Sequence, residues 1–246
     1  MQLLTIIIPV YNEEKTIEEL LKRTKNAKTP GWRKSIIVVN DGSTDDSGKI
    51  LKKLKRKYNF TPKKGSFLII NHKDNRGKGA AIKSAISLAR RGLASVNAVL
   101  TQDADLEYDP ADYKVLLRAF HPKKFPVVYG SRNLGNTNRG YWFAYLCGRA
   151  LTEIHNLVYG SRLTDVHTGY KLVRADILGN CNLTVDGFDF CNELTAKILK
   201  MGHKIREVPI NYYPRTFAEG KKVTAKDTLK DLITLLKYKF WYTTRS

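Results

Sequence analysis

Three carboxylates follow one of the apolar runs of this sequence at alternate positions: Asp103, Asp105 and Glu107. The apolar run itself, residues 96–101, is typical of a buried strand. Alternate side chains of an extended chain point to the same side. Carboxylate oxygens are the ligands that Mg²⁺ and Mn²⁺ prefer, together with water and substrate phosphates. The spacing therefore favours a divalent metal site, and the alternative is a solvated acidic loop that leads into a helix at Pro110.

Polar residues also follow the first two apolar runs of the chain. Tyr11 and Glu13 come after the first run, and Asp41 comes after the second. A carboxylate such as that of Asp41 can accept hydrogen bonds from the ring N–H groups of a nucleobase, while the ring of Tyr11 offers an apolar wall. The segment 41–45 is equally typical of a turn that caps a helix. Neither use excludes the other.

Several basic residues are candidates for binding a phosphate group. Arg76 and Lys78 alternate with two glycines where a helix is expected to begin, and a helix start favours phosphate through its free amides. The segment lacks the ending of a Walker motif. Four further cations follow predicted strands: Arg132, Arg215, Lys221 and Lys222. Each alone is typical of a solvated surface, so the anion site depends on their convergence.

Asp165 and Asp189 are the candidates for a general base, which is needed only if a hydroxyl group attacks. His167 lies two residues after Asp165 and would share a strand face with it. No nucleophile motif of the Gly-x-Ser-x-Gly kind accompanies the two residues, so their spacing alone does not predict a catalytic dyad. Cys191 has no partner for nucleophilic chemistry and is expected to be packed.

The elements that must position these residues alternate along the chain. Apolar runs and segments of helical periodicity follow one another, which predicts an α/β protein with a doubly wound, mostly parallel sheet flanked by helices. Ligands of such sheets lie outside the carboxyl ends of the strands, where the polar clusters stand. The expected strands are residues 3–10, 36–39, 67–70, 96–101 and 126–130, with a further strand near 205–212. Residues 1–225 form one domain in this interpretation, followed by a helix in 226–246.

This C-terminal helix carries an apolar stripe at helical spacing: Leu229, Leu232, Ile233, Leu236 and Phe240. Its lysines lie off the stripe. The pattern predicts either a helix docked on the domain or an interfacial helix on anionic lipid. The basic run 49–64 is usually a solvated face, but it could also meet lipid head groups.

The composition is that of a folded and strongly basic protein. Of 246 residues, 42% are hydrophobic, which excludes a disordered chain. Lys and Arg number 43 against 23 Asp and Glu, so the net charge of +20 favours nucleic acid, an anionic membrane surface or a phosphorylated substrate. Three cysteines without a paired motif indicate a reduced, cytoplasmic setting. Because no apolar run approaches the ~20 residues of a membrane span, contact with the inner or cytosolic membrane face would be peripheral.

Several motifs together resemble family 2 glycosyltransferases of the GT-A fold. They are the segments 8–13 (IPVYNE), 39–45 (VNDGSTD), 103–105 (DAD), 130–132 (GSR) and 168–171 (TGYK), in that order. The sequence is most similar to the branch with dolichyl-phosphate mannose synthase, dolichyl-phosphate glucose synthase and bacterial polyprenyl-phosphate glycosyltransferases. The resemblance continues through Glu193 and residues 212–215 to 220–222, and so covers nearly the whole chain.

The resemblance implies roles at the matching positions. The base and ribose of a nucleotide would be held by Pro9, Tyr11, Glu13 and Asp41. The metal and the diphosphate would be held by Asp103 and Asp105, with Glu107 as a third metal ligand. The cations that would meet the acceptor phosphate and the donor diphosphate are Arg132, Arg215, Lys221 and Lys222.

The implied reaction is the inverting transfer of a hexose, dependent on Mg²⁺ or Mn²⁺, from a nucleotide sugar of the GDP-mannose or UDP-glucose type. Its acceptor would be a polyprenyl phosphate such as dolichyl or undecaprenyl phosphate. A phosphate acceptor is already ionised and needs no strong base. One alternative keeps the donor chemistry with a sugar or protein hydroxyl as acceptor. Another is a non-catalytic basic module that binds nucleic acid or anionic lipid; its charge fits but the motifs do not, so no nucleic acid is expected.

Overall fold

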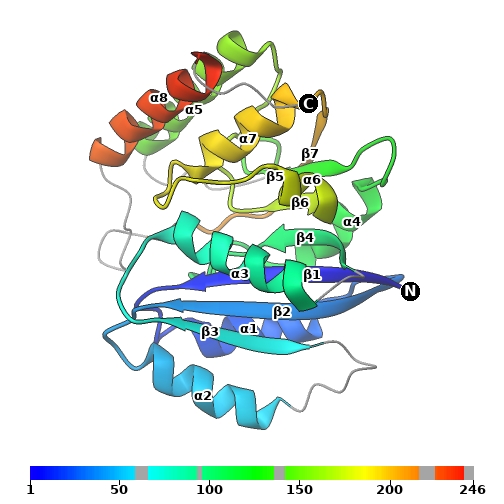
Figure 1. Ribbon diagram of the computed structural model, residues 1–246, viewed down its shortest axis with the longest axis vertical. Helices are drawn as coiled ribbons and strands as arrows, with labels where there is room; N and C mark the ends of the chain where they lie inside the picture. Colours follow the sequence, from blue (N-terminus) through cyan, green and yellow to red (C-terminus); the bar gives the residue numbers. More distant parts are fainter. Residues whose placement is uncertain (59–65, 93–95, 136–141, 216–224, 241–246) are drawn as a thin grey trace.

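The computed structural model describes residues 1–58, 66–92, 96–135, 142–215 and 225–240. A seven-stranded sheet in the order β3-β2-β1-β4-β6-β5-β7 forms its centre, with helices on both faces (Figure 1). The strands are β1 (Gln2–Val10), β2 (Trp32–Asp41), β3 (Phe67–His72), β4 (Val96–Thr101), β5 (Val127–Ser131), β6 (Lys171–Arg174) and β7 (Ile205–Pro209). Neighbouring strands are parallel except where β6 takes part. The expected α/β class with a mostly parallel sheet is confirmed.

Strand β1 lies inside the sheet and belongs to two hydrophobic cores. Ile6 and Ile8 face one core, and Ile7 between them faces the other. All three side chains are fully buried. A strand that is covered on both faces has to be apolar at successive positions rather than at alternate ones. This requirement explains the unbroken apolar run near the start of the chain.

The helices divide between the two faces of the sheet. On the face of Ile6 and Ile8 lie α1 (Ile17–Asn26), α2 (Ser47–Lys57), the 3-10 helix η1 (Pro110–Asp112) and α4 (Tyr113–Ala119). On the other face lie α3 (Lys78–Gly92), α6 (Ala175–Asn180) and α7 (Phe190–Lys200). The remaining two, α5 (Trp142–Tyr159) and α8 (Ala225–Phe240), pack with α7 at one end of the molecule (Figure 1).

The short strand β6 runs against its neighbours, and the sequence did not predict it. It pairs antiparallel with both β4 and β5. Because it is reversed, its first residue lies at the edge of the sheet where the parallel strands end. The preceding loop, residues 164–170, is thereby brought to that edge, where Thr101 Oγ1 donates to the carbonyl oxygen of Gly169 at 2.6 Å. The polar strand ends and this loop together line one edge of the sheet.

Helix α8 is docked on the domain, but not through the predicted apolar stripe. Its buried side chains are Asp231, Thr234, Leu235 and Tyr238. Ile233, Leu236 and Phe240 are instead 58%, 40% and 73% exposed. The side chain of Leu229 lies outside the described residues. Leu232 of the stripe is half-buried, and the helix docks through the polar side chains of Asp231 and Thr234 together with Leu235 and Tyr238.

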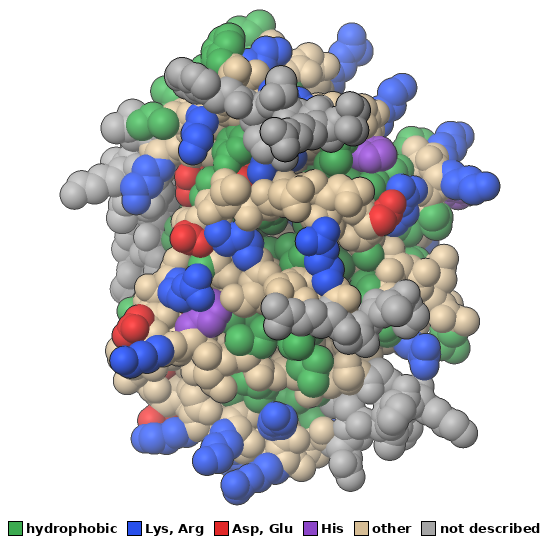
Figure 2. Space-filling view, in the orientation of Figure 1, with side chains coloured by type: hydrophobic (Ala, Val, Ile, Leu, Met, Phe, Trp, Pro, Cys, Tyr) green, Lys and Arg blue, Asp and Glu red, His purple; other side chains and the backbone are tan. Residues whose placement is uncertain are grey.

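Within the described residues, no helix combines the length and the apolar character that crossing a bilayer requires. The basic composition is visible at the surface. Lysine and arginine side chains are spread over the face drawn in Figure 2, and acidic side chains are few there.

Candidate active site

The turn after β4 carries the predicted acidic residues, and a buried glutamine anchors it. Gln102 is fully buried, and its Oε1 accepts hydrogen bonds from Tyr113 Oη at 2.7 Å and Tyr170 Oη at 2.6 Å. Leu106 takes a positive φ of 62°, an unusual conformation for a side chain of this kind. The chain therefore turns sharply between Asp105 and Glu107 instead of staying extended as the alternate spacing implied.

The structure brings together four of the predicted acidic residues and two of the predicted cations. Lys78 Nζ lies 2.5 Å from Asp103 Oδ1. Arg215 lies among the other carboxylates, with its Nη1 3.1 Å from Glu13 Oε2 and its Nη2 3.4 Å from Asp105 Oδ2. The fourth carboxylate, Glu107, lies 3.9 Å from Arg215 Nε. Two of the predicted cations, Lys78 and Arg215, therefore lie among the predicted carboxylates at this edge of the sheet.

The electrostatics of this cluster show a surplus of buried negative charge. Burial raises the pKa of Asp105 to about 7, helped by the charges of Asp103 and Glu107 and opposed by Arg215. Burial alone would lower the pKa of Lys78, yet the charge of Asp103 raises it overall. Carboxylates that repel one another in this way favour a bound cation. Their oxygen donors are also the kind that Mg²⁺ and Mn²⁺ take.

Asp103, Asp105 and Glu107 do not form a three-ligand cluster. Among the described residues, no three His, Cys, Asp or Glu side chains are placed to hold one metal ion. Glu107 has other partners: its Oε2 accepts from Tyr212 Oη at 2.8 Å, and its Oε1 from the backbone N–H of Arg215 at 2.7 Å. Asp103 and Asp105 remain as carboxylates for a metal. Two are enough where substrate phosphates and water complete the shell.

Tyr11 and Asp41 lie at the ends of neighbouring strands, as expected. β1 and β2 are in register up to Val10 and Asn40, so Tyr11, which follows β1, comes next to Asp41, the last residue of β2. Asp41 is buried, and its carboxylate is engaged within the chain: it accepts from the backbone N–H of Gly77 at 2.7 Å and lies 2.6 Å from His72 Nδ1. Asp41 therefore fixes the loop that opens α3. Pro9 lies within β1 itself.

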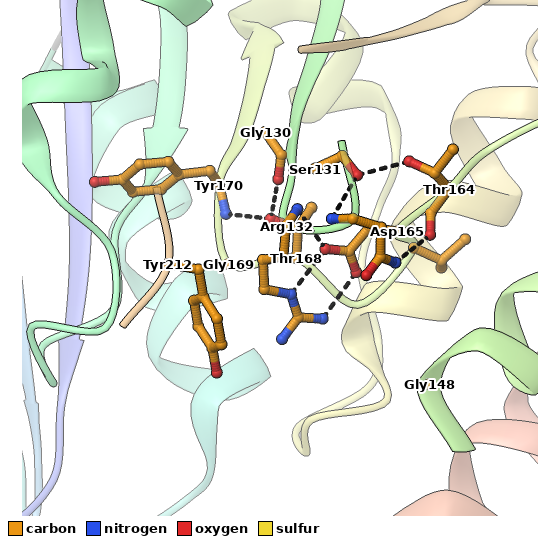
Figure 3. A network of polar contacts seen from close by, with 12 residues as sticks. Gly130, Ser131, Arg132, Gly148, Thr164, Asp165, Thr168, Gly169, Tyr170 and Tyr212 are labelled. Atoms are coloured by element: carbon orange, nitrogen blue, oxygen red, sulfur yellow. Dashed lines mark hydrogen bonds and ion pairs between the residues drawn. The ribbon is translucent and has the colours of Figure 1, made fainter. Parts of the chain in front are cut away.

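Arg132 and Asp165 form a mostly buried ion pair near Tyr212, whose ring centroid lies 5.1 Å from Arg132 Cζ (Figure 3). Asp165 Oδ2 accepts from Arg132 Nε at 2.7 Å, and Oδ1 accepts from Nη2 at 2.8 Å. Burial would raise the pKa of Asp165, but the charge and the hydrogen bonds of Arg132 lower it overall. A carboxylate held in this way is a poor proton acceptor. The geometry makes Asp165 the residue that orients Arg132.

Asp189, the other candidate base, lies at the start of α7. Its Oδ2 accepts from Thr234 Oγ1 of α8 at 2.7 Å. The aromatic rings on either side of it, Phe188 and Phe190, have their centroids 5.9 and 5.8 Å from Lys78 Nζ. Asp189 is thus a sequence neighbour of two residues that lie near Lys78, but its own carboxylate accepts a hydrogen bond from α8. Lys221 and Lys222 lie outside the described residues.

Several residues that support the site were not predicted from the sequence. Tyr108 Oη accepts from the backbone N–H of Gly169 at 2.8 Å, and Lys171 Nζ donates to the carbonyl oxygens of Val166 and Thr168, both at 2.7 Å. A Cβ atom on Gly169 would lie 2.5 Å from Asp103 Oδ2. This close approach explains the glycine of the Thr-Gly-Tyr-Lys segment. Only the motif itself could have indicated these residues, because their partners are remote in sequence.

Comparison with known proteins shows similarity over most of the chain. The model of the glycosyl transferase family 2 matches residues 5–181. A dolichyl-phosphate beta-glucosyltransferase of Trichomonas vaginalis is 26% identical, over 97% of this chain and 73% of that protein. A dodecaprenyl-phosphate galacturonate synthase of Rhizobium johnstonii is 24% identical, over 97% of this chain and 67% of that protein.

A solved structure is also similar to the chain throughout its length. Glucosyl-3-phosphoglycerate synthase from Mycobacterium tuberculosis, in complex with Mn²⁺, UDP-glucose and phosphoglyceric acid, matches with a TM-score of 0.71. The identity is 17%, and the match covers 97% of this chain and 80% of that one. At this identity the likeness bears on the fold, and it confirms the expected GT-A fold.

Proposed function

The chain belongs to glycosyl transferase family 2, and we propose that it transfers a hexose from a nucleotide sugar to the phosphate group of a polyprenyl phosphate. The reaction inverts the anomeric carbon and depends on Mg²⁺ or Mn²⁺. The relatives named as a dolichyl-phosphate beta-glucosyltransferase and a dodecaprenyl-phosphate galacturonate synthase support this acceptor. Because the family is one of enzymes, a non-catalytic basic module is no longer an alternative.

One observation carries the choice of a phosphate acceptor over a hydroxyl. Both carboxylates proposed as a general base have other partners: Asp165 is paired with Arg132, and Asp189 accepts from Thr234. A hydroxyl acceptor needs a base to take its proton, whereas a phosphate near neutral pH is already a nucleophile. Arg132, held by Asp165, then supplies the charge that binds this phosphate.

On the donor side, the residues of this chain bind and stabilise the diphosphate. Asp103 and Asp105 would hold the metal ion, which neutralises the charge of the diphosphate when bound. Lys78 and Arg215 lie against the same carboxylates and supply positive charge where the leaving group develops negative charge. Pro9 and Tyr11 would line the pocket of the base, and Asp41 would fix the loop beside it. Glu13 would hold Arg215 in place.

The test is a transfer assay with the purified chain. Labelled GDP-mannose and UDP-glucose are offered with Mg²⁺, Mn²⁺ or a chelator, and the acceptor is either a water-soluble, short-chain polyprenyl phosphate or a free sugar. We expect metal-dependent transfer to the polyprenyl phosphate and none to the sugar. Transfer to the sugar alone would refute the acceptor. Transfer that persists with the chelator would refute the proposed metal dependence.

A further inference from the structure

Large exposed hydrophobic side chains gather on two neighbouring helices. On α5 they are Leu146, Ile154 and Leu157, and on α8 they are Ile233, Leu236 and Phe240. We call these six residues the α5–α8 face. Leu157 is 87% exposed and Phe240 is 73% exposed. Apolar side chains scattered singly over a surface need no explanation, but such a concentration marks a binding surface.

Specific hydrogen bonds fix which side of α8 faces the domain. Asp231 Oδ1 accepts from Asn192 Nδ2 at 2.8 Å. Tyr238 Oη donates to Glu193 Oε1 at 2.7 Å, and Thr234 pairs with Asp189. These bonds turn the polar side of the helix toward α7. The apolar side is consequently turned outward, the reverse of what burial in the domain would produce.

The two helices lie side by side, since Tyr159 Oη of α5 donates to the carbonyl oxygen of Leu235 at 2.8 Å. Exposed lysines accompany the apolar residues of α8: Lys230, Lys237 and Lys239. Figure 2 shows hydrophobic and basic side chains at this end of the molecule. Helix α2, at the opposite end, also has exposed lysines, but Leu51 and Leu54 are buried against the sheet. Of these two helical surfaces, as far as the structure describes them, the α5–α8 face combines charge with large exposed apolar groups and α2 does not.

We infer that the α5–α8 face binds the surface of a bilayer that contains anionic lipid. Its apolar side chains would enter the boundary of the acyl chains, and its lysines would pair with head groups. This inference deepens the proposed function, because a polyprenyl phosphate is presented at a bilayer. The acceptor side of the site is near: His167 Nε2 lies 3.5 Å from Asp231 Oδ2, so α8 adjoins the loop that holds Asp165.

The test is flotation of the full chain with vesicles, either of phosphatidylcholine alone or of equal parts phosphatidylcholine and phosphatidylglycerol. We expect binding to the mixed vesicles. A triple variant, Ile233→Ser, Leu236→Ser and Phe240→Ser, should lose most of this binding. Its melting temperature should stay close to that of the unsubstituted chain, because the three side chains are exposed.

A matched pair of charge variants separates this face from the general basic charge. Lys230→Gln with Lys237→Gln should weaken partitioning about thirtyfold, at about 1 kcal/mol for each lysine near an anionic surface. Lys52→Gln with Lys53→Gln on α2 removes the same charge and should leave partitioning within about twofold. Equal losses in the two variants would overturn the inference, and so would full binding by the serine variant.

Two controls complete the experiment. Sedimentation velocity without vesicles tests whether the face joins two copies of the chain, and a dimer that the serine variant abolishes would overturn the inference. Transfer to the water-soluble polyprenyl phosphate should be retained by all the variants. If that transfer is absent in the unsubstituted chain while flotation gives the expected result, the proposed acceptor is refuted and the inference that the α5–α8 face binds membranes is retained.

Discussion

Asp165 accepts three hydrogen bonds from Arg132, two from the guanidinium at 2.7 and 2.8 Å and one from the backbone N–H at 3.0 Å. The carboxylate is buried, whereas the arginine side chain is 26% exposed. The pair therefore fixes the orientation of the guanidinium, whose Cζ lies 5.1 Å from the centroid of the Tyr212 ring. Glu207 supports it from behind by accepting from the backbone N–H of Asp165 at 2.9 Å.

Asp165→Asn should lower the free energy of unfolding by about 2–3 kcal/mol near neutral pH, because it removes the partner of a mostly buried charge. Arg132 lowers the pKa of Asp165 in the folded state. The stability that this pair contributes is therefore present above the ordinary pKa of about 4 and is lost as the pH falls toward the folded-state value. Urea unfolding at about pH 7 and about pH 3 should show the two proteins converging in acid.

The matched control is Asp176→Asn on α6. Asp176 also makes a two-point contact with Arg174, at 2.6 and 2.8 Å, but it is 58% exposed. Exposed pairs contribute at most about 1 kcal/mol. A loss as large as that of Asp165→Asn would show that burial of the Arg132 pair is not what stabilises it.

Asp105→Ala should reduce turnover by about a thousandfold, since it removes a carboxylate that in the proposed function would hold the metal beside the leaving diphosphate. The fold should survive, because the substitution relieves repulsion from Asp103 and Glu107. Calorimetry with Mn²⁺ and nucleoside diphosphate should show weaker binding, and circular dichroism should be unchanged. Glu18→Ala, at an exposed position of α1, is the control. Full activity in Asp105→Ala would contradict the proposed site.

Gly169→Ala should disrupt the donor side, because its Cβ would lie 2.5 Å from Asp103 Oδ2 and 2.9 Å from the ring of Tyr108. We expect a lower melting temperature and weaker binding of Mn²⁺ with nucleotide. Gly148→Ala is the control, since nothing lies within 4 Å of a Cβ at that point of α5. It should raise stability by up to about 1 kcal/mol, as alanine favours a helix over glycine. Similar effects from both variants would refute the steric explanation.

Arg215→Lys keeps the charge but loses the planar fork that reaches Glu13 and Asp105 together. Turnover should fall by about a hundredfold, while melting temperature changes little. Steady-state kinetics with donor and metal in excess measure this loss. Arg206→Lys, at an exposed position of β7, should behave as the unsubstituted chain. Unchanged turnover in Arg215→Lys would mean that only the charge matters.

The sequence was sufficient to predict the parallel strands and the polar residues at their ends. Both depend on local patterns, such as the apolar run that ends at Val10 and the acidic turn at Asp103. It was not sufficient for β6, which has only four residues and begins with the polar Lys171. Nor could it pair Arg132 with Asp165, which are remote in sequence and meet only because β5 and β6 are neighbours.

The outward face of α8 was also beyond prediction, for a different reason. Helical spacing shows that apolar residues share a side, but it does not say which side meets the domain. That choice depends on the hydrogen bonds of Asp231 and Thr234 with α7, which no periodicity contains. Likewise, Glu107, the expected third metal ligand, accepts a hydrogen bond from Tyr212, a residue more than a hundred positions away.

The reversed direction of β6 has an evolutionary consequence. In the proposed function, residues at the ends of β1, β2 and β4 bind the nucleotide, and Asp165, in the loop that enters β6, holds Arg132, the cation proposed for the acceptor. Under this proposal, substitutions around Asp165 would change which molecule receives the sugar, whereas Gly169, in the same loop and next to Asp103, would have to stay for the donor. One fold would in this way serve several acceptors through changes in the part of this loop around Asp165.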